Sequence, residues 1–121
     1  MKETLVVIAL MSVARAAGDA PNVTVQMTSS DAFVPKTLTI KAGGTVTWEN
    51  VSPGVHTVTD NPALASSKQD AAMPAEAEAF NSGTIEPGKQ YSHTFTVPGT
   101  YKYFCVPHEA DGMVGTIVVT K

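Results

Sequence analysis

The chain has 121 residues, of which 43% are hydrophobic and 16% charged, a composition typical of one globular domain. Its formal net charge of -3 argues against nucleic acid as a partner. A single cysteine, Cys105, excludes an internal disulfide. In an oxidising compartment a lone thiol needs something to hold it.

Residues 1–16 have the layout of a secretory signal peptide. Lys2 precedes an apolar run at 5–11, and Ala14 and Ala16 form an A-x-A cleavage site. The run is shorter than the roughly 20 apolar residues that a membrane span needs. We therefore expect export by the general secretory route, with the periplasm as the destination. The mature domain, residues 17–121, is expected to have no membrane span.

From residue 20 onward, short runs of alternating polar and apolar residues are separated by turn residues. This pattern predicts an all-β domain of about eight strands in two packed sheets, with Trp48, Phe95 and Tyr101 in the core. The expected strands are 22–27, 37–41, 45–50, 55–59, 83–85, 90–97, 100–105 and 116–120.

Residues 61–79 interrupt the pattern, since they are rich in alanine, contain Pro62 and Pro74, and show no alternation. We expect one long connection here, with a short helix near 75–80. Outside it, His93 shares a face with Tyr91 and Phe95, which indicates a core or edge-of-core residue. Met27 and Met73 are interpreted as packing or loop residues.

Four side chains carry metal-binding chemistry. Cys105, His108 and Met113 follow one another at spacings of three and five, and His56 supplies a second imidazole upstream. Two imidazoles, a thiolate and a thioether are the ligands of a blue-copper electron-transfer site. Zinc fits less well, because structural zinc sites use more cysteines and catalytic ones keep a position for water.

The segment Cys105-Val106-Pro107-His108, with Met113 and then Val114-Gly115-Thr116-Ile117, resembles the plastocyanin, halocyanin and pseudoazurin branch of the cupredoxins. The resemblance covers nearly the whole mature domain. It implies an eight-stranded Greek-key sandwich that carries one copper, cycling between Cu(I) and Cu(II). By resemblance the ligands are His56, Cys105, His108 and axial Met113.

Two positions depart from that family. Thr57 stands where plastocyanin-like proteins usually have Asn, and Phe104 stands where plant plastocyanins have Tyr. We expect the backbone N–H of Thr57 to donate to the Cys105 sulfur all the same. Clustered acidic patches are also missing from the sequence, so a photosynthetic partner does not follow.

The favoured function is one-electron transport, without enzymatic activity, by a monomer that docks transiently with a redox donor and acceptor such as a cytochrome or a terminal oxidase or reductase. The alternative is a copper carrier for metal homeostasis that uses the same ligands. A copper enzyme is disfavoured, because three histidines with no His-x-His pair cannot build further copper centres. A cysteine-nucleophile hydrolase fits the Pro and Met of this loop less well than copper does.

Charges and apolar residues near the ligands suggest a docking face. Val55, Pro107, Ala110 and Gly112 are expected to form its apolar part. Glu109 and Asp111 are either solvated charges or a negative rim that attracts a basic partner.

Overall fold

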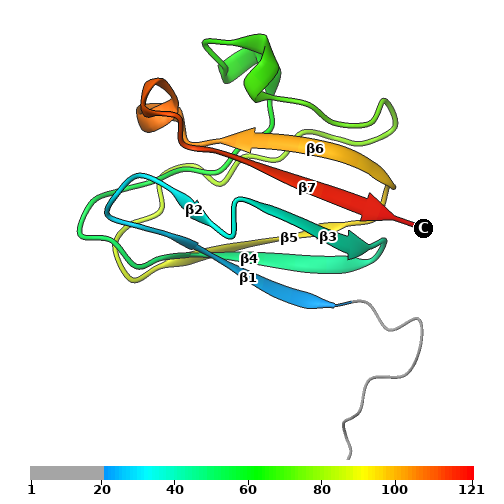
Figure 1. Cartoon of the computed structure of the whole chain (residues 1–121), viewed down its shortest axis with the longest axis horizontal. Coiled ribbons are helices and arrows are strands. Elements are labelled where there is room, and N and C mark those ends of the chain that lie inside the picture. Colours follow the sequence, from blue (N-terminus) through cyan, green and yellow to red (C-terminus); the bar gives the residue numbers. More distant parts are fainter. Residues whose placement is uncertain (1–20) are drawn as a thin grey trace, which may run out of the picture.

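Two β-sheets stacked face to face form the fold (Figure 1). The computed structural model describes residues 21–121, so the predicted signal peptide lies outside the described residues. One sheet has the order β2-β1-β4-β5 and the other the order β3-β7-β6. The strands are β1 (Asn22–Met27), β2 (Phe33–Val34), β3 (Thr37–Lys41), β4 (Gly44–Asn50), β5 (Gln90–Phe95), β6 (Gly99–Phe104) and β7 (Val114–Thr120).

The strand order confirms an all-β Greek-key sandwich. Chain neighbours β1 and β2 pair antiparallel, whereas β1 pairs with β4 and β3 pairs with β7 in parallel. Such parallel pairs arise because the chain crosses between the sheets before it returns. β6 and β7, which flank the predicted ligand loop, are consecutive strands and pair antiparallel.

Alternation explains why these segments are strands. In β4 the side chains of Val46 and Trp48 are buried, while Thr45 and Thr47, which alternate with them, are half-buried on the other face. Thr45 there forms a hydrogen bond of 2.8 Å with Thr94 of β5. Each strand thus presents one apolar face to the space between the sheets.

Aromatic side chains fill that space around Trp48, which is fully buried. Its ring centroid lies 5.3–6.3 Å from those of Phe80, Tyr91, Phe95 and Tyr103. The predicted core positions Trp48, Phe95 and Tyr101 are confirmed.

The smaller predictions about packing also hold. His93 is half-buried, and its ring centroid lies 4.5 Å from that of Phe80 and 4.7 Å from that of Phe95. Met27 is fully buried in the core, and Met73 packs against it. His93 is therefore an edge-of-core histidine, as expected.

Residues 55–59 and 83–85, predicted as strands, form only isolated bridges. His56 pairs with Ile85, and Thr59 pairs with Asn81 and Phe104. A ladder does not continue because the intervening N–H groups go elsewhere: Thr57 donates to the Cys105 sulfur and Val58 to the Ser82 hydroxyl. The pair Phe33–Val34, which was not predicted, forms strand β2 instead.

The long alanine-rich connection is present, and it covers the edge of β6 (green in Figure 1). Ala72 exchanges backbone hydrogen bonds of 3.1 and 2.9 Å with Lys102 of β6. The short helix expected near 75–80 is wrong, because that stretch forms only a single turn, in which the Ala77 N–H donates to the Pro74 carbonyl at 3.0 Å. The helical turns of the connection lie earlier, as the 3-10 segments η1 (Pro62–Leu64) and η2 (Lys68–Asp70). Among the described residues, no helix is long and apolar enough to cross a membrane.

Candidate metal centre

All four predicted ligand residues lie at one end of the sandwich. Cys105 follows β6, His108 belongs to the 3-10 segment η3 (Val106–Asp111), and Met113 precedes β7. His56 comes from the other direction, in the connection between β4 and β5, where its backbone exchanges hydrogen bonds of 3.2 and 2.8 Å with Ile85. The sandwich thus brings together a histidine and a loop about fifty residues apart in the sequence.

A hydrogen-bonded turn that the sequence analysis missed places His56. The Asn50 side chain donates to the carbonyls of Gly54 and Ile85 at 2.8 and 2.9 Å. It also accepts from the Ser52 hydroxyl at 2.6 Å. Both Asn50 and Ser52 are buried, so these bonds fix the chain just before His56.

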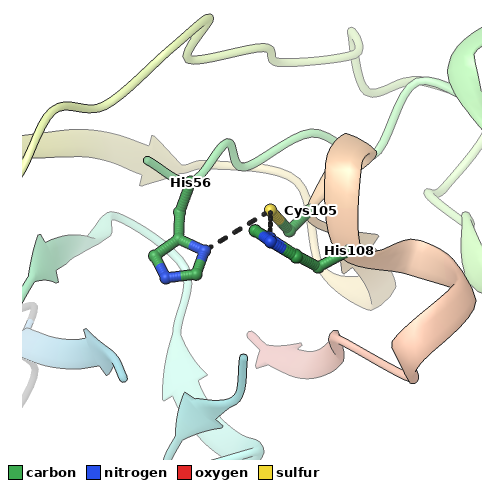
Figure 2. Close-up of side chains that lie close together, drawn as sticks. All are labelled: His56, Cys105 and His108. Atoms are coloured by element: carbon green, nitrogen blue, oxygen red, sulfur yellow. Dashed lines mark hydrogen bonds between the residues drawn. The ribbon is translucent and has the colours of Figure 1, made fainter. Parts of the chain in front are cut away.

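The two imidazoles converge on the cysteine (Figure 2). The Cys105 Sγ lies 3.7 Å from the His56 Nδ1 and 3.5 Å from the His108 Nδ1. The three donor atoms all lie within 4.8 Å of one another.

These separations fit a metal ion. Bonds of about 2.0 Å to imidazole nitrogen and about 2.3 Å to thiolate place N and S about 3.5–3.7 Å apart, for tetrahedral to trigonal angles. The observed distances of 3.5 and 3.7 Å fall in that range. The donor set is therefore already arranged for one metal ion.

Hydrogen bonds hold the sulfur in place. The backbone N–H of Thr57 donates to the Cys105 Sγ at 3.3 Å, as the sequence analysis expected. The Thr57 hydroxyl accepts from the Val106 N–H at 2.8 Å and so ties the His56 segment to the ligand loop. Although Thr57 replaces the usual Asn, it provides a side-chain bond to this loop.

Burial shapes the protonation of the donors. Burial raises the pKa of the Cys105 thiol, and the Thr57 N–H lowers it in part. Burial, followed by the proximity of His108, lowers the pKa of His56. The apo-site therefore favours a neutral thiol and a neutral imidazole, and a bound metal would displace the thiol proton.

Met113 lies with Cys105 in the same hydrophobic core cluster, and both side chains are fully buried. The Cys105 N–H donates to the Met113 carbonyl at 3.1 Å, and the Met113 N–H donates to that of His108 at 3.2 Å. The loop closes at Gly112, whose φ of 81° is the left-handed conformation that glycine adopts readily. Met113 is thereby brought back to the base of the loop.

Glu109 is neither a solvated charge nor part of a negative rim, so both expectations for it are wrong. Its side chain points inward, and the residue is only 8% exposed. Its carboxylate accepts from the backbone N–H groups of Ser66 and Ser67 at 2.8–3.1 Å. Asp111, by contrast, is exposed. The ligand loop is thus fastened to the alanine-rich connection.

One edge of the site reaches the surface at His108, whose side chain is 26% exposed, whereas His56 is 2% exposed. A cavity of about 340 Å³ lies beside them, with Val55, Pro107 and Asp31 in its lining. The predicted apolar docking residues Val55, Pro107, Ala110 and Gly112 are all exposed.

A His₂Cys set that is buried except at His108, with a methionine in the same loop, on a Greek-key sandwich, defines the class of blue-copper proteins, the cupredoxins. Comparison with known proteins agrees. The profile of "copper binding proteins, plastocyanin/azurin family" matches residues 21–120, so the chain belongs to that family and its cofactor is copper.

Individual relatives of known name support the same family assignment. The plastocyanin of Scenedesmus fuscus is 40% identical over 87 residues, which cover 72% of this chain and 85% of that protein. The chloroplastic plastocyanin of Chlamydomonas reinhardtii is 41% identical over 88 residues, 72% of this chain but only 57% of that protein.

Solved structures match the fold. A pseudoazurin from Sinorhizobium is similar, with a TM-score of 0.65 at 26% identity over 84% of this chain and 75% of that one. A purple cupredoxin from Nitrosopumilus maritimus shares the fold, with a TM-score of 0.64 at 24% identity over 80% of this chain and 98% of that one.

Proposed function

We propose that this protein is an exported one-electron carrier whose single copper would be held by His56, Cys105, His108 and Met113. The observation that carries the proposal is the convergence of two imidazole nitrogens on one buried thiol at 3.5 and 3.7 Å. Copper bound there supplies reversible exchange between Cu(I) and Cu(II), for which soft sulfur and borderline nitrogen ligands are suited.

The residues around the donors support electron transfer rather than catalysis. Cys105 and Met113 are fully buried and do not line the cavity beside the two histidines, so a substrate held in that cavity would not reach the sulfur donors. Hydrogen bonds from Thr57 and within the Asn50 turn hold the donors in a preset arrangement. A site that changes little between oxidation states favours rapid electron exchange through the exposed His108 edge.

That edge suits short-lived docking of a redox protein, such as a cytochrome or a terminal oxidase or reductase. Exposed Val55 and Val106, at 42% and 44%, lie on the segments that carry His56 and His108. A small apolar surface of this kind is typical of weak electron-transfer complexes. We propose that the mature protein acts as a monomer in the periplasm, after removal of residues 1–16.

The test is the visible spectrum of the mature protein after addition of Cu(II), before and after ascorbate. We expect an intense thiolate-to-copper band that bleaches on reduction and returns on oxidation. Cys105→Ser should remove the band but leave the fold, whereas the matched control His93→Gln, an imidazole outside the site, should keep it. A folded, copper-bound protein without the band would overturn the proposal.

The alternative role, copper delivery with the same ligands, predicts a different behaviour. A carrier protein would pass Cu(I) readily to a competing chelator and exchange electrons slowly between its own oxidised and reduced forms. An electron carrier should show fast self-exchange and retain its copper in the presence of the same chelator. Measuring both rates on one preparation separates the two functions.

A further inference from the structure

The carboxylate of Asp31 lies close to the partly exposed imidazole of His108 in the metal centre. The Asp31 Oδ1 lies 3.5 Å from the His108 Nε2, and the two side chains are 34% and 26% exposed. The other ring nitrogen of His108, Nδ1, faces the Cys105 sulfur at 3.5 Å. The imidazole therefore lies between the sulfur and a carboxylate.

The backbone presents this carboxylate from outside the ligand loop. Asp31 belongs to the connection between β1 and β2, where its N–H donates to the Thr28 carbonyl at 3.1 Å and the Thr28 N–H donates to that of Ala32 at 3.0 Å. Asp31 has a φ of 57°, a left-handed conformation that Asp and Asn adopt more readily than other non-glycine residues. The turn thus fixes the backbone of Asp31 independently of η3.

The charge of Asp31 also acts on two of the donors, His56 and Cys105. It raises the pKa of both His56 and Cys105, although burial is the larger influence on each. Among the acidic residues of the ligand loop itself, Glu109 is turned toward Ser66 and Ser67. Asp31 is accordingly the carboxylate placed to affect copper.

We propose that Asp31 is a positioning residue that orients the His108 imidazole through Nε2 and lowers the reduction potential of the bound copper. A carboxylate behind a metal-bound histidine fixes its tautomer and makes it a more basic ligand. The negative charge also stabilises the ion of higher charge, Cu(II), relative to Cu(I). The inference rests on the proposed function, because it assigns His108 to copper.

The test compares the reduction potentials of wild type and Asp31→Asn. Asn keeps the side-chain shape and the left-handed turn but removes the charge. Because outer-shell partners of metal ligands change affinity at least about tenfold, we expect the ratio of Cu(I) to Cu(II) affinity to rise about tenfold. For a one-electron couple this raises the potential by about 59 mV.

Asp111→Asn is the matched control, since it removes the same charge from an exposed position in η3. Its effect should be small and should vanish at high ionic strength. If Asp31→Asn shifts the potential no more than this control does, Asp31 is only a turn residue and the inference is wrong.

A second readout does not depend on redox activity. In zinc-loaded protein, ¹⁵N NMR should show a His108 Nε2–H whose exchange with water is slower than in Asp31→Gly. Equal exchange rates would overturn the orienting role even where no blue band forms. Failure of the proposed function would appear separately, as a wild-type protein without the reversible band.

Discussion

Asp60 is a buried carboxyl group whose ionisation should oppose folding. The residue is fully buried, and its Oδ1 accepts from the Phe80 N–H at 2.9 Å. Its Oδ2 has no hydrogen-bond partner within the described part of the chain. Burial raises the pKa of Asp60 from 3.8 to about 6, and the Phe80 N–H offsets only part of that rise. Asp60→Asn keeps an acceptor for Phe80 and removes the charge.

The sign follows from the two protonation states. Well below pH 3.8 the carboxyl is neutral in both folded and unfolded chains, so its contribution to stability is fully present. As the pH rises toward about 6, the unfolded chain ionises first, and stability is lost until the folded carboxyl ionises too. The difference between 3.8 and about 6 corresponds to at most about 3 kcal/mol.

The assay is urea unfolding of the apo-protein from about pH 4 to about pH 8, for wild type and Asp60→Asn. The stability of the variant relative to wild type should rise by up to about 3 kcal/mol across this range. Titration of the histidines is common to both proteins and cancels in the difference. Asp111→Asn, an exposed control, should give a flat difference. A flat or falling difference for Asp60→Asn would refute the reasoning.

Three further substitutions test the site and its support. Glu109→Ala should destabilise the protein by about 1–3 kcal/mol in urea unfolding, because the part-buried N–H groups of Ser66 and Ser67 lose a charged acceptor. A loss below about 0.5 kcal/mol would count against a stabilising role for this contact. Gly115→Ala should cost about 1–3 kcal/mol and lower the melting temperature, since its Cβ would clash with the Tyr103 ring and hydroxyl. An unchanged melting temperature would contradict that close contact. Pro107→Ala should raise the reduction potential by giving Cys105 a second N–H donor, and an unchanged or lowered potential would argue against this tuning.

Much of the fold could be predicted from local pattern. Alternation in segments such as 22–27 and 45–50 predicts strands because one face of each must be buried, and these segments are strands β1 and β4. The pattern fails where other groups satisfy the backbone. The alternation in residues 55–59 predicted a strand. The N–H of Thr57 instead donates to the Cys105 sulfur and that of Val58 to the Ser82 hydroxyl, so the segment forms only isolated bridges.

For the candidate metal centre, too, some features could be predicted from the sequence and others could not. The sequence by itself determined the donor types and their spacing in the ligand loop, because Cys105, His108 and Met113 are close along the chain. Only the tertiary structure decided that Asp31 lies behind His108 and that Glu109 points inward to the alanine-rich connection. Both contacts join segments that are distant in sequence, and a carboxylate in a loop carries no local signal of the partner that folding gives it.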